Sequence, residues 1–148
     1  MKYSACIIFM IMILASINGC IETNVPADKM FQVLIANPIP KEIKELQGSG
    51  YTWQGHLIFL RFKTTSAEAI TKIISKGYAE AEWKEISYRF DLPEEFKTCF
   101  TPPWNATMKP GIKCYSKKNV SNSWTENGEH FLFIDEENLT IYFIACGA

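Results

Sequence analysis

The segment 129–146 constrains the fold of this chain more than any other part of the sequence. Two runs rich in β-branched and aromatic residues, 129–135 and 139–146, flank the acidic pair Glu136-Glu137. This pattern predicts a β-hairpin. Both faces of the two strands are apolar, whereas a strand with one solvated face alternates apolar and polar residues. We therefore expect this hairpin at the centre of a sheet, with one face covered by a helix.

A two-residue loop at Glu136-Glu137 would fix the register of the hairpin. It places Leu132 opposite Ile141 and Ile134 opposite Leu139 on one face. The other face then carries the large side chains of Phe131, Phe133 and Tyr142.

A strand and a helix are predicted in succession in the middle of the chain. In the strand, 53–63, residues 58, 60 and 62 are apolar and share one face, which we expect to be core. The helix, about 65–76, begins with a capping box formed by Thr65 and Glu68. It carries an apolar stripe and ends before Gly77, which can adopt the left-handed conformation. The stripe consists of Ile70, Ile73 and Ile74.

The remaining segments give weaker patterns. Residues 29–36 form an apolar run that predicts a strand, and 40–46 favour one or two helical turns with Ile43 and Leu46 inward. The glycines of 47–50 indicate a break in the chain. Residues 83–90 are compatible with a further strand, and 91–128, rich in proline, with irregular structure.

These elements together predict an α+β fold. We expect a single domain with a mainly antiparallel sheet of four or five strands. One main helix, about 65–76, packs on the sheet, and a β-hairpin forms its C-terminal part.

The first twenty residues have the pattern of an export signal. Lys2 is the only charged residue, and an apolar run follows it that is shorter than the roughly 20 residues a membrane span requires. Ile17, Gly19 and Cys20 match the lipobox of bacterial lipoproteins, which the leader resembles; Asn18 departs from the usual pattern. An ordinary secretory signal and a retained membrane anchor are the alternatives.

This resemblance implies a signal peptide at 1–19, cleavage before Cys20 and lipid on its thiol. Residues 20–28 would then be a tether and 29–148 the globular domain. The order of strand, helix, aromatic loop and hairpin is also loosely similar to small bacterial lipoproteins, a resemblance that implies no activity. We expect attachment to a bacterial cell envelope, with the domain outside the cytoplasm.

The net charge and the cysteines of the sequence bear on three possibilities: nucleic-acid binding, a disulfide bridge and a metal site. Residues 20–148 contain 14 basic and 16 acidic side chains, a balance that disfavours nucleic-acid binding. Outside the cytoplasm thiols tend to pair, and we favour a Cys99–Cys114 bridge, because it would close a loop rich in proline. A bridge to Cys146, or three reduced thiols, are the alternatives. The cysteine spacing favours no metal site, and we expect no cofactor.

The sequence lacks the common catalytic motifs that would indicate an enzyme. The chain has no nucleophile elbow, no His-Glu-x-x-His and no phosphate-binding glycine loop. We therefore expect a non-enzymatic binding protein for an envelope protein or glycan. Trp53, Trp104 and Trp124 lie beside turn-forming residues and are candidate binding residues. Trp104 is favoured among them because Pro102-Pro103 precedes it.

Two alternative functions remain open at this point. One is a small envelope hydrolase that uses paired carboxylates. Its candidate residues are Glu94, Glu95, Asp135 and Glu137. The other is a structural subunit that binds no separable ligand.

Overall fold

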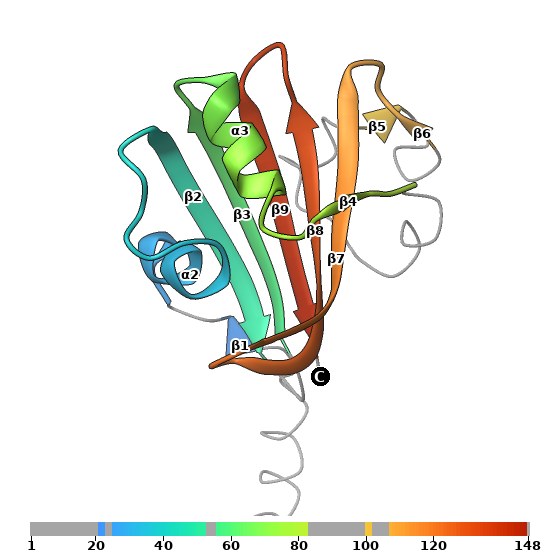
Figure 1. Cartoon of the computed structure of the whole chain (residues 1–148). Coiled ribbons are helices and arrows are strands. Elements are labelled where there is room, and N and C mark those ends of the chain that lie inside the picture. Colours follow the sequence, from blue (N-terminus) through green and yellow to red (C-terminus); the bar gives the residue numbers. More distant parts are fainter. Residues whose placement is uncertain (1–20, 23–24, 53–55, 83–99, 102–106, 148) are drawn as a thin grey trace, which may run out of the picture.

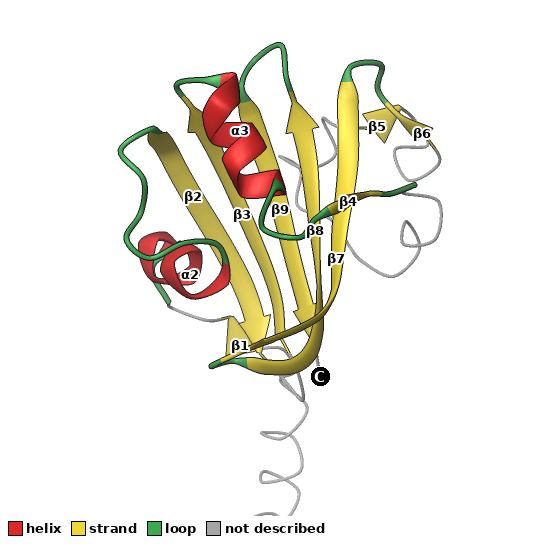
Figure 2. Ribbon diagram, in the orientation of Figure 1, coloured by secondary structure: helices red, strands yellow, loops and turns green. Residues whose placement is uncertain are grey.

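The computed structural model describes residues 21–22, 25–52, 56–82, 100–101 and 107–147. They form a seven-stranded antiparallel sheet with two helices on one face, and a separate two-stranded sheet (Figures 1 and 2). The α+β class with a mainly antiparallel sheet is confirmed, although the main sheet has seven strands instead of the expected four or five.

The order of strands in the main sheet is β1-β2-β3-β9-β8-β7-β4, and every neighbouring pair is antiparallel. Strands β5 (Phe100–Thr101) and β6 (Thr107–Met108) form the small sheet. The members of the main sheet are β1 (Ile21–Glu22), β2 (Ile43–Thr52), β3 (His56–Thr64), β4 (Ala79–Glu80), β7 (Ile112–Asn122), β8 (Thr125–Asp135) and β9 (Thr140–Gly147).

Residues predicted as the first strand form a helix instead. Helix α2 (Ala27–Leu34) follows Pro26 and has Asp28 in its first turn, where a carboxylate stabilises the positive end of the helix dipole. Its buried residues are Met30, Phe31 and Leu34. Their spacing is that of a helix, so the strand prediction for 29–36 was wrong because the apolar run was taken as continuous.

Residues 43–50 of the predicted turn-and-break region, 40–50, belong to β2, which begins at Ile43. A β-bulge between Lys44 and Gln47, with Glu45 at φ 50°, lets the strand continue through a region that was expected to break. Gly48 allows α2 to approach the sheet closely. A Cβ at this position would lie 3.2 Å from both Ala27 Cβ and Met30 Sδ. The glycine therefore marks close packing rather than a turn.

The predicted strand and helix in the middle of the chain are confirmed with small shifts. Strand β3 begins at His56, since residues 53–55 lie outside the described residues. Helix α3 (Ala67–Ile74) is capped by Ser66, whose hydroxyl accepts a hydrogen bond from the Ala69 amide at 3.3 Å. The cap is thus one residue later than the Thr65 expected from the capping box. Gly77 has a φ of 96°, as predicted.

The C-terminal hairpin is confirmed, but its register is shifted by two residues. Leu132 pairs with Phe143 and Ile134 with Ile141, because the turn spans four residues, 136–139, instead of two. A shift of two leaves every side chain on its predicted face. β8 and β9 also lie inside the sheet, as expected.

The segment 91–128 is more regular than predicted. Residues 112–122 and 125–128 lie in β7 and β8, and only residues 91–99 and 102–106 of this segment are outside the described part. Register shifts after Lys117 and after Val120, with Asn119 at φ 55°, obscured the strand pattern. The strand suggested at 83–90 also lies outside the described residues.

The main sheet has buried side chains on both faces. On the face under α2 and α3, here called the helix face, strand residues such as Leu60, Leu132 and Phe143 pack with Phe31 and Ile73. The opposite face carries a smaller cluster. Its buried members are Phe59, Cys114, Phe131, Phe133, Tyr142 and Ile144.

Candidate functional site

A cleft opens on the helix face between α2 and α3, at the Ile43 end of β2. Its volume is about 120 Å³. Apolar groups of Phe31, Ile43 and Ile73 line it, together with Pro40 of the loop after α2. Phe31, Ile43 and Ile73 belong to α2, β2 and α3 and are part of the helix-face core, which holds these apolar groups of the lining in place.

Charged side chains of both signs also line this cleft. Glu42 and Glu68 contribute carboxylates, Lys72 contributes an ammonium group from α3, and Lys76 contributes one from the turn that follows α3. Burial, followed by repulsion from Lys72 and Lys117, lowers the pKa of Lys76. The cleft therefore combines apolar lining with mixed charge, which suits a partner carrying an apolar group flanked by polar ones.

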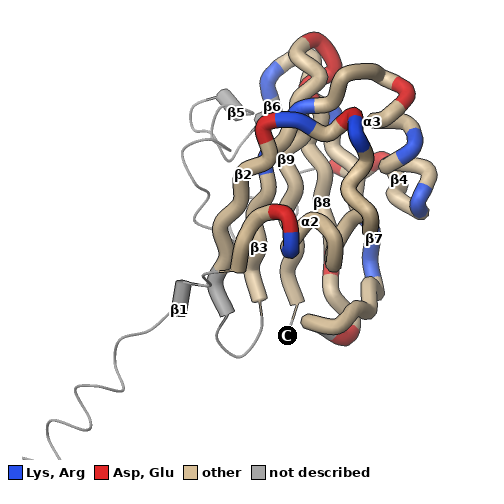
Figure 3. The backbone as a smooth tube through the Cα atoms, turned by 90° about the vertical axis from the view of Figure 1, so that its left-hand side faces the viewer, with Lys and Arg blue, Asp and Glu red and all other residues tan. Residues whose placement is uncertain are grey.

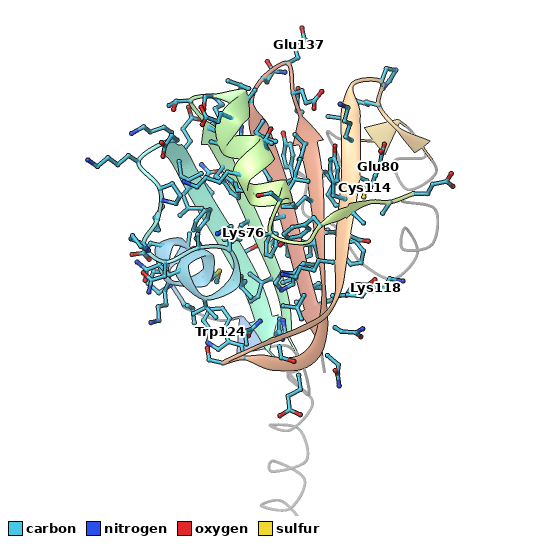
Figure 4. All side chains as sticks on the ribbon, in the orientation of Figure 1. Lys76, Glu80, Cys114, Lys118, Trp124 and Glu137 are labelled. Carbon is cyan, nitrogen blue, oxygen red and sulfur yellow. The ribbon has the colours of Figure 1, made fainter. Side chains whose placement is uncertain are left out.

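Two lysines hold the ends of the helices. Lys76 Nζ donates a hydrogen bond to the carbonyl of Ile35, just after α2, at 2.9 Å. Lys117 Nζ from β7 donates to the carbonyl of Lys76, just after α3, at 2.8 Å. Figure 4 shows Lys76 at the end of α3 nearer to α2. These bonds satisfy carbonyls that helix ends leave without partners, so both lysines have a structural role.

A pair of buried histidines lies on the helix face, away from the cleft. His130 is 1% exposed; its Nδ1 lies 3.2 Å from the Tyr78 hydroxyl, and its ring packs edge-on against Phe143. Burial, then Lys117 and His56, lowers its pKa to about 4. Burial also lowers the pKa of His56. Both rings are therefore neutral near pH 7.

The Nε2 atoms of both histidines are buried and have no hydrogen-bond partner within the part of the chain that the structure describes. Burial raises the pKa of Tyr78, so its hydroxyl stays protonated. Among the described residues, the groups that act on His130 are Lys117, His56 and the Tyr78 hydroxyl. Among the residues that the structure describes, no group of three or more metal-ligating side chains occurs. The pair is thus a buried polar site within the helix-face core.

The three candidate tryptophans have different outcomes. Trp53 and Trp104 lie outside the described residues. Trp124 lies in the turn between β7 and β8, where its amide donates to Asn122 Oδ1 at 2.8 Å. Its side chain is half-buried against the helix-face core. It does not line the cleft between α2 and α3.

The favoured disulfide is not formed in this structure. Cys114 is a free thiol, buried on the opposite face, and burial raises its pKa to about 12. Cys99 lies outside the described residues, as does Cys20. Cys146 keeps its S–H, which donates to the carbonyl of Glu129 at 3.6 Å.

A bridge from Cys114 to Cys146 is excluded by the register. Cys114 pairs with Phe133, and Phe133 pairs with Tyr142, four residues before Cys146 on β9. Four residues of strand span about 13 Å, whereas the Cα atoms of a disulfide lie about 4.4–6.8 Å apart.

Of the four carboxylates proposed for a hydrolase, Asp135 and Glu137 lie among the described residues, both at the β8–β9 turn. Glu94 and Glu95 lie outside that part of the chain. Asp135 accepts hydrogen bonds from the amide and the side chain of Asn138, at 3.0 and 2.8 Å, and so stabilises the β8–β9 turn. Glu137 is exposed in the same turn.

The cleft between α2 and α3 was not predicted from the sequence. Residues 29–36 were predicted to form a strand, so the sequence did not predict α2, which forms one side of the cleft. The helical spacing of Ala27, Met30, Phe31 and Leu34 is the signal that would have revealed it.

Neither the protein-family models nor the curated proteins nor the solved structures gave a match to this chain. None of the helices in the described part is long and apolar enough to span a membrane.

Proposed function

We propose that this chain is an exported, lipid-anchored binding protein that holds a protein partner in the cleft between α2 and α3 without catalysing a reaction. The observation that carries this proposal is the cleft itself, with apolar lining and carboxylate and ammonium groups together. Its volume of about 120 Å³ is slightly smaller than an engineered cavity of ~150 Å³ that binds benzene. It therefore has room for one apolar side chain of a partner.

The same lining favours a protein over a glycan. Sugar rings stack on exposed aromatic faces, and the one aromatic residue of the lining, Phe31, is fully buried. A protein segment can place an apolar side chain in the cleft and polar groups against Glu42, Glu68 and Lys72. Interfaces of this kind have an apolar core with a polar rim.

The leader supports the lipid anchor. Ile17, Gly19 and Cys20 match the lipobox pattern, and residues 1–19 would be removed. One acyl chain gives only marginal membrane binding, whereas two or more give stable attachment. A lipidated Cys20 would supply such an anchor without an apolar helix.

Photo-crosslinking in the native host tests the partner site. A benzophenone amino acid replaces Lys72, which lines the cleft, or Thr71, the adjacent exposed residue of α3 that does not line it. We expect a discrete protein adduct from position 72 that is absent from position 71, identified by mass spectrometry. Equal adducts from both positions, or a glycan adduct at position 72, would contradict the proposal.

Intact-mass analysis of the same protein tests the anchor. We expect cleavage before Cys20 and the added mass of acyl chains, both lost in the Cys20→Ser variant. An unmodified Cys20 in the processed protein would rule out the anchor.

A further inference from the structure

Strand β1 follows the proposed lipid-bearing cysteine directly. Ile21 pairs with Thr52 and Glu22 with Tyr51, so pairing with the sheet starts one residue after Cys20. Consecutive Cα atoms are about 3.8 Å apart. The segment 20–28, expected to be a tether, therefore provides almost no slack, and its last two residues already belong to α2.

The register shows which end of the sheet is attached. Thr52 pairs with His56, and His56 with Gly147, so the attached end contains the end of β2, the start of β3 and the end of β9. Figure 1 shows the β7–β8 turn at this same end and the β8–β9 turn at the opposite end. Figure 4 shows the corresponding separation of Trp124 and Glu137.

Charge is distributed unevenly between the two ends. In Figure 3, most lysine, arginine and acidic residues gather at the end distant from β1. Exposed examples in its loops and strand ends are Lys41, Glu42, Lys44, Glu45, Glu136 and Glu137. Near the attached end, Lys118 pairs with Glu129 at 3.6 Å, and the half-buried Trp124 lies in the turn. Tryptophan is enriched at membrane–water interfaces.

We infer that the lipid holds the β1 end of the sheet against the bilayer and directs the cleft between α2 and α3 away from it. This orientation rests on the proposed lipid anchor at Cys20. The cleft lies at Ile43, nine residues along β2 from Thr52. Nine residues of strand span about 30 Å, which is more than the roughly 5–8 Å of headgroup region on each side of the hydrocarbon core and places the cleft beyond the lipid headgroups.

The orientation restricts the partner. A lipid headgroup cannot reach a cleft at this height, so the occupant is a soluble protein or the aqueous part of a membrane protein. The covalent tether, rather than a basic surface, sets the orientation, because the described residues of the attached end include Glu22, Glu126 and Glu129 beside Lys118 and so present no excess of basic groups.

Energy transfer from two turns to the bilayer surface tests this inference. The full-length lipidated protein, with a fluorescent amino acid at Ser123 or at Glu137, is reconstituted into phosphatidylcholine vesicles with a minor share of phosphatidylglycerol and a headgroup-labelled acceptor lipid. Both positions are exposed turn residues. We expect transfer from position 123 to be at least about threefold stronger, because the two turns lie at ends of the sheet about 30 Å apart.

A spacer variant provides the control. A flexible Gly-Ser insertion of about 16 residues between Cys20 and Ile21, which spans roughly 20 Å, should make transfer from the two positions nearly equal. Equal transfer at the native spacing, in protein whose acylation is verified by mass, would overturn the orientation and leave the anchor standing. A protein without acyl chains would overturn both.

Discussion

The two faces of the main sheet are both buried but differ in what they contain. The opposite face has a compact cluster of mainly aromatic side chains and the thiol of Cys114, with Arg61 over the ring of Tyr142 at 5.9 Å. The helix face has a larger core, two buried histidines, helix ends held by lysines and a cleft. The opposite face therefore consists mainly of packed apolar side chains, whereas the buried titratable histidines and the cleft lie on the helix face, through which we expect changes of pH to act.

The largest expected effect tests whether both faces are true cores. Phe143 on the helix face and Phe133 on the opposite face are both fully buried on neighbouring strands. Each substitution, Phe143→Ala or Phe133→Ala, should lower the free energy of unfolding by about 3–5 kcal/mol. Urea denaturation followed by fluorescence measures both. A loss below about 1 kcal/mol for Phe133→Ala would show that the opposite face is not a core.

The second effect is specific to the helix face and depends on pH. The pKa of His130 is about 4 in the folded protein, against 6.5 in an unfolded chain. The unfolded state therefore binds a proton first as the pH falls from 6.5 to 4, and stability should decrease by roughly 3 kcal/mol in that range. Above pH 6.5 this contribution is fully retained.

Urea midpoints at neutral and acidic pH measure this dependence. His130→Phe should remove a large part of it, since a phenyl ring cannot take up the proton and fits beside Phe143. Tyr78→Phe, which deletes only the hydroxyl near Nδ1, should retain the acid sensitivity. An unchanged pH profile in His130→Phe would assign the sensitivity to another group.

The third effect concerns the contact between α2 and the sheet. A Cβ at Gly48 would lie 2.6 Å from Leu60 Cδ2 as well as close to Ala27 and Met30. Gly48→Ala should therefore cost about 1–3 kcal/mol through overpacking. Thermal unfolding measures the loss. A neutral or stabilising result would show that α2 does not pack as closely on β2 as described.

A smaller effect distinguishes the two candidate caps of α3. Ser66→Ala removes the hydroxyl that accepts from the Ala69 amide and should cost about 1 kcal/mol. Thr65→Ala serves as the matched control and should change the free energy of unfolding by less than about 0.5 kcal/mol. The reverse order would restore the capping box at Thr65.

The smallest expected effect is the reaction of Cys114, on the opposite face, with an alkylating reagent. Cys114 is buried and the pKa of its thiol is raised to about 12. It should resist iodoacetamide in the native protein and react after denaturation without prior reduction. Peptide mapping by mass spectrometry locates the label. Labelling of Cys114 only after reduction would restore the disulfide proposed from the sequence.

The sequence alone determined the elements with a clear period. The alternation of Ile58, Leu60 and Phe62 defined β3, and the apolar stripe with Gly77 defined α3. The two-sided apolar pattern of 129–146 placed the hairpin inside the sheet. In each case the side chains of a single segment reveal which face is buried, so no distant partner is needed to interpret it.

Only the tertiary structure decided the elements that depend on a distant partner. Gly48 pairs with Leu60 within β2 and lies where α2 packs closely on the sheet, and the bulges of β2 and β7 interrupt the periodicity on which sequence patterns depend. The register of the β8–β9 hairpin depends on the length of its turn. This turn spans four residues, 136–139, whereas the acidic pair Glu136-Glu137 indicated only two. The cleft exists because α2 and α3, more than 30 residues apart in sequence, end beside the same strand. Such contacts depend on how separate segments pack together, which local pattern does not encode.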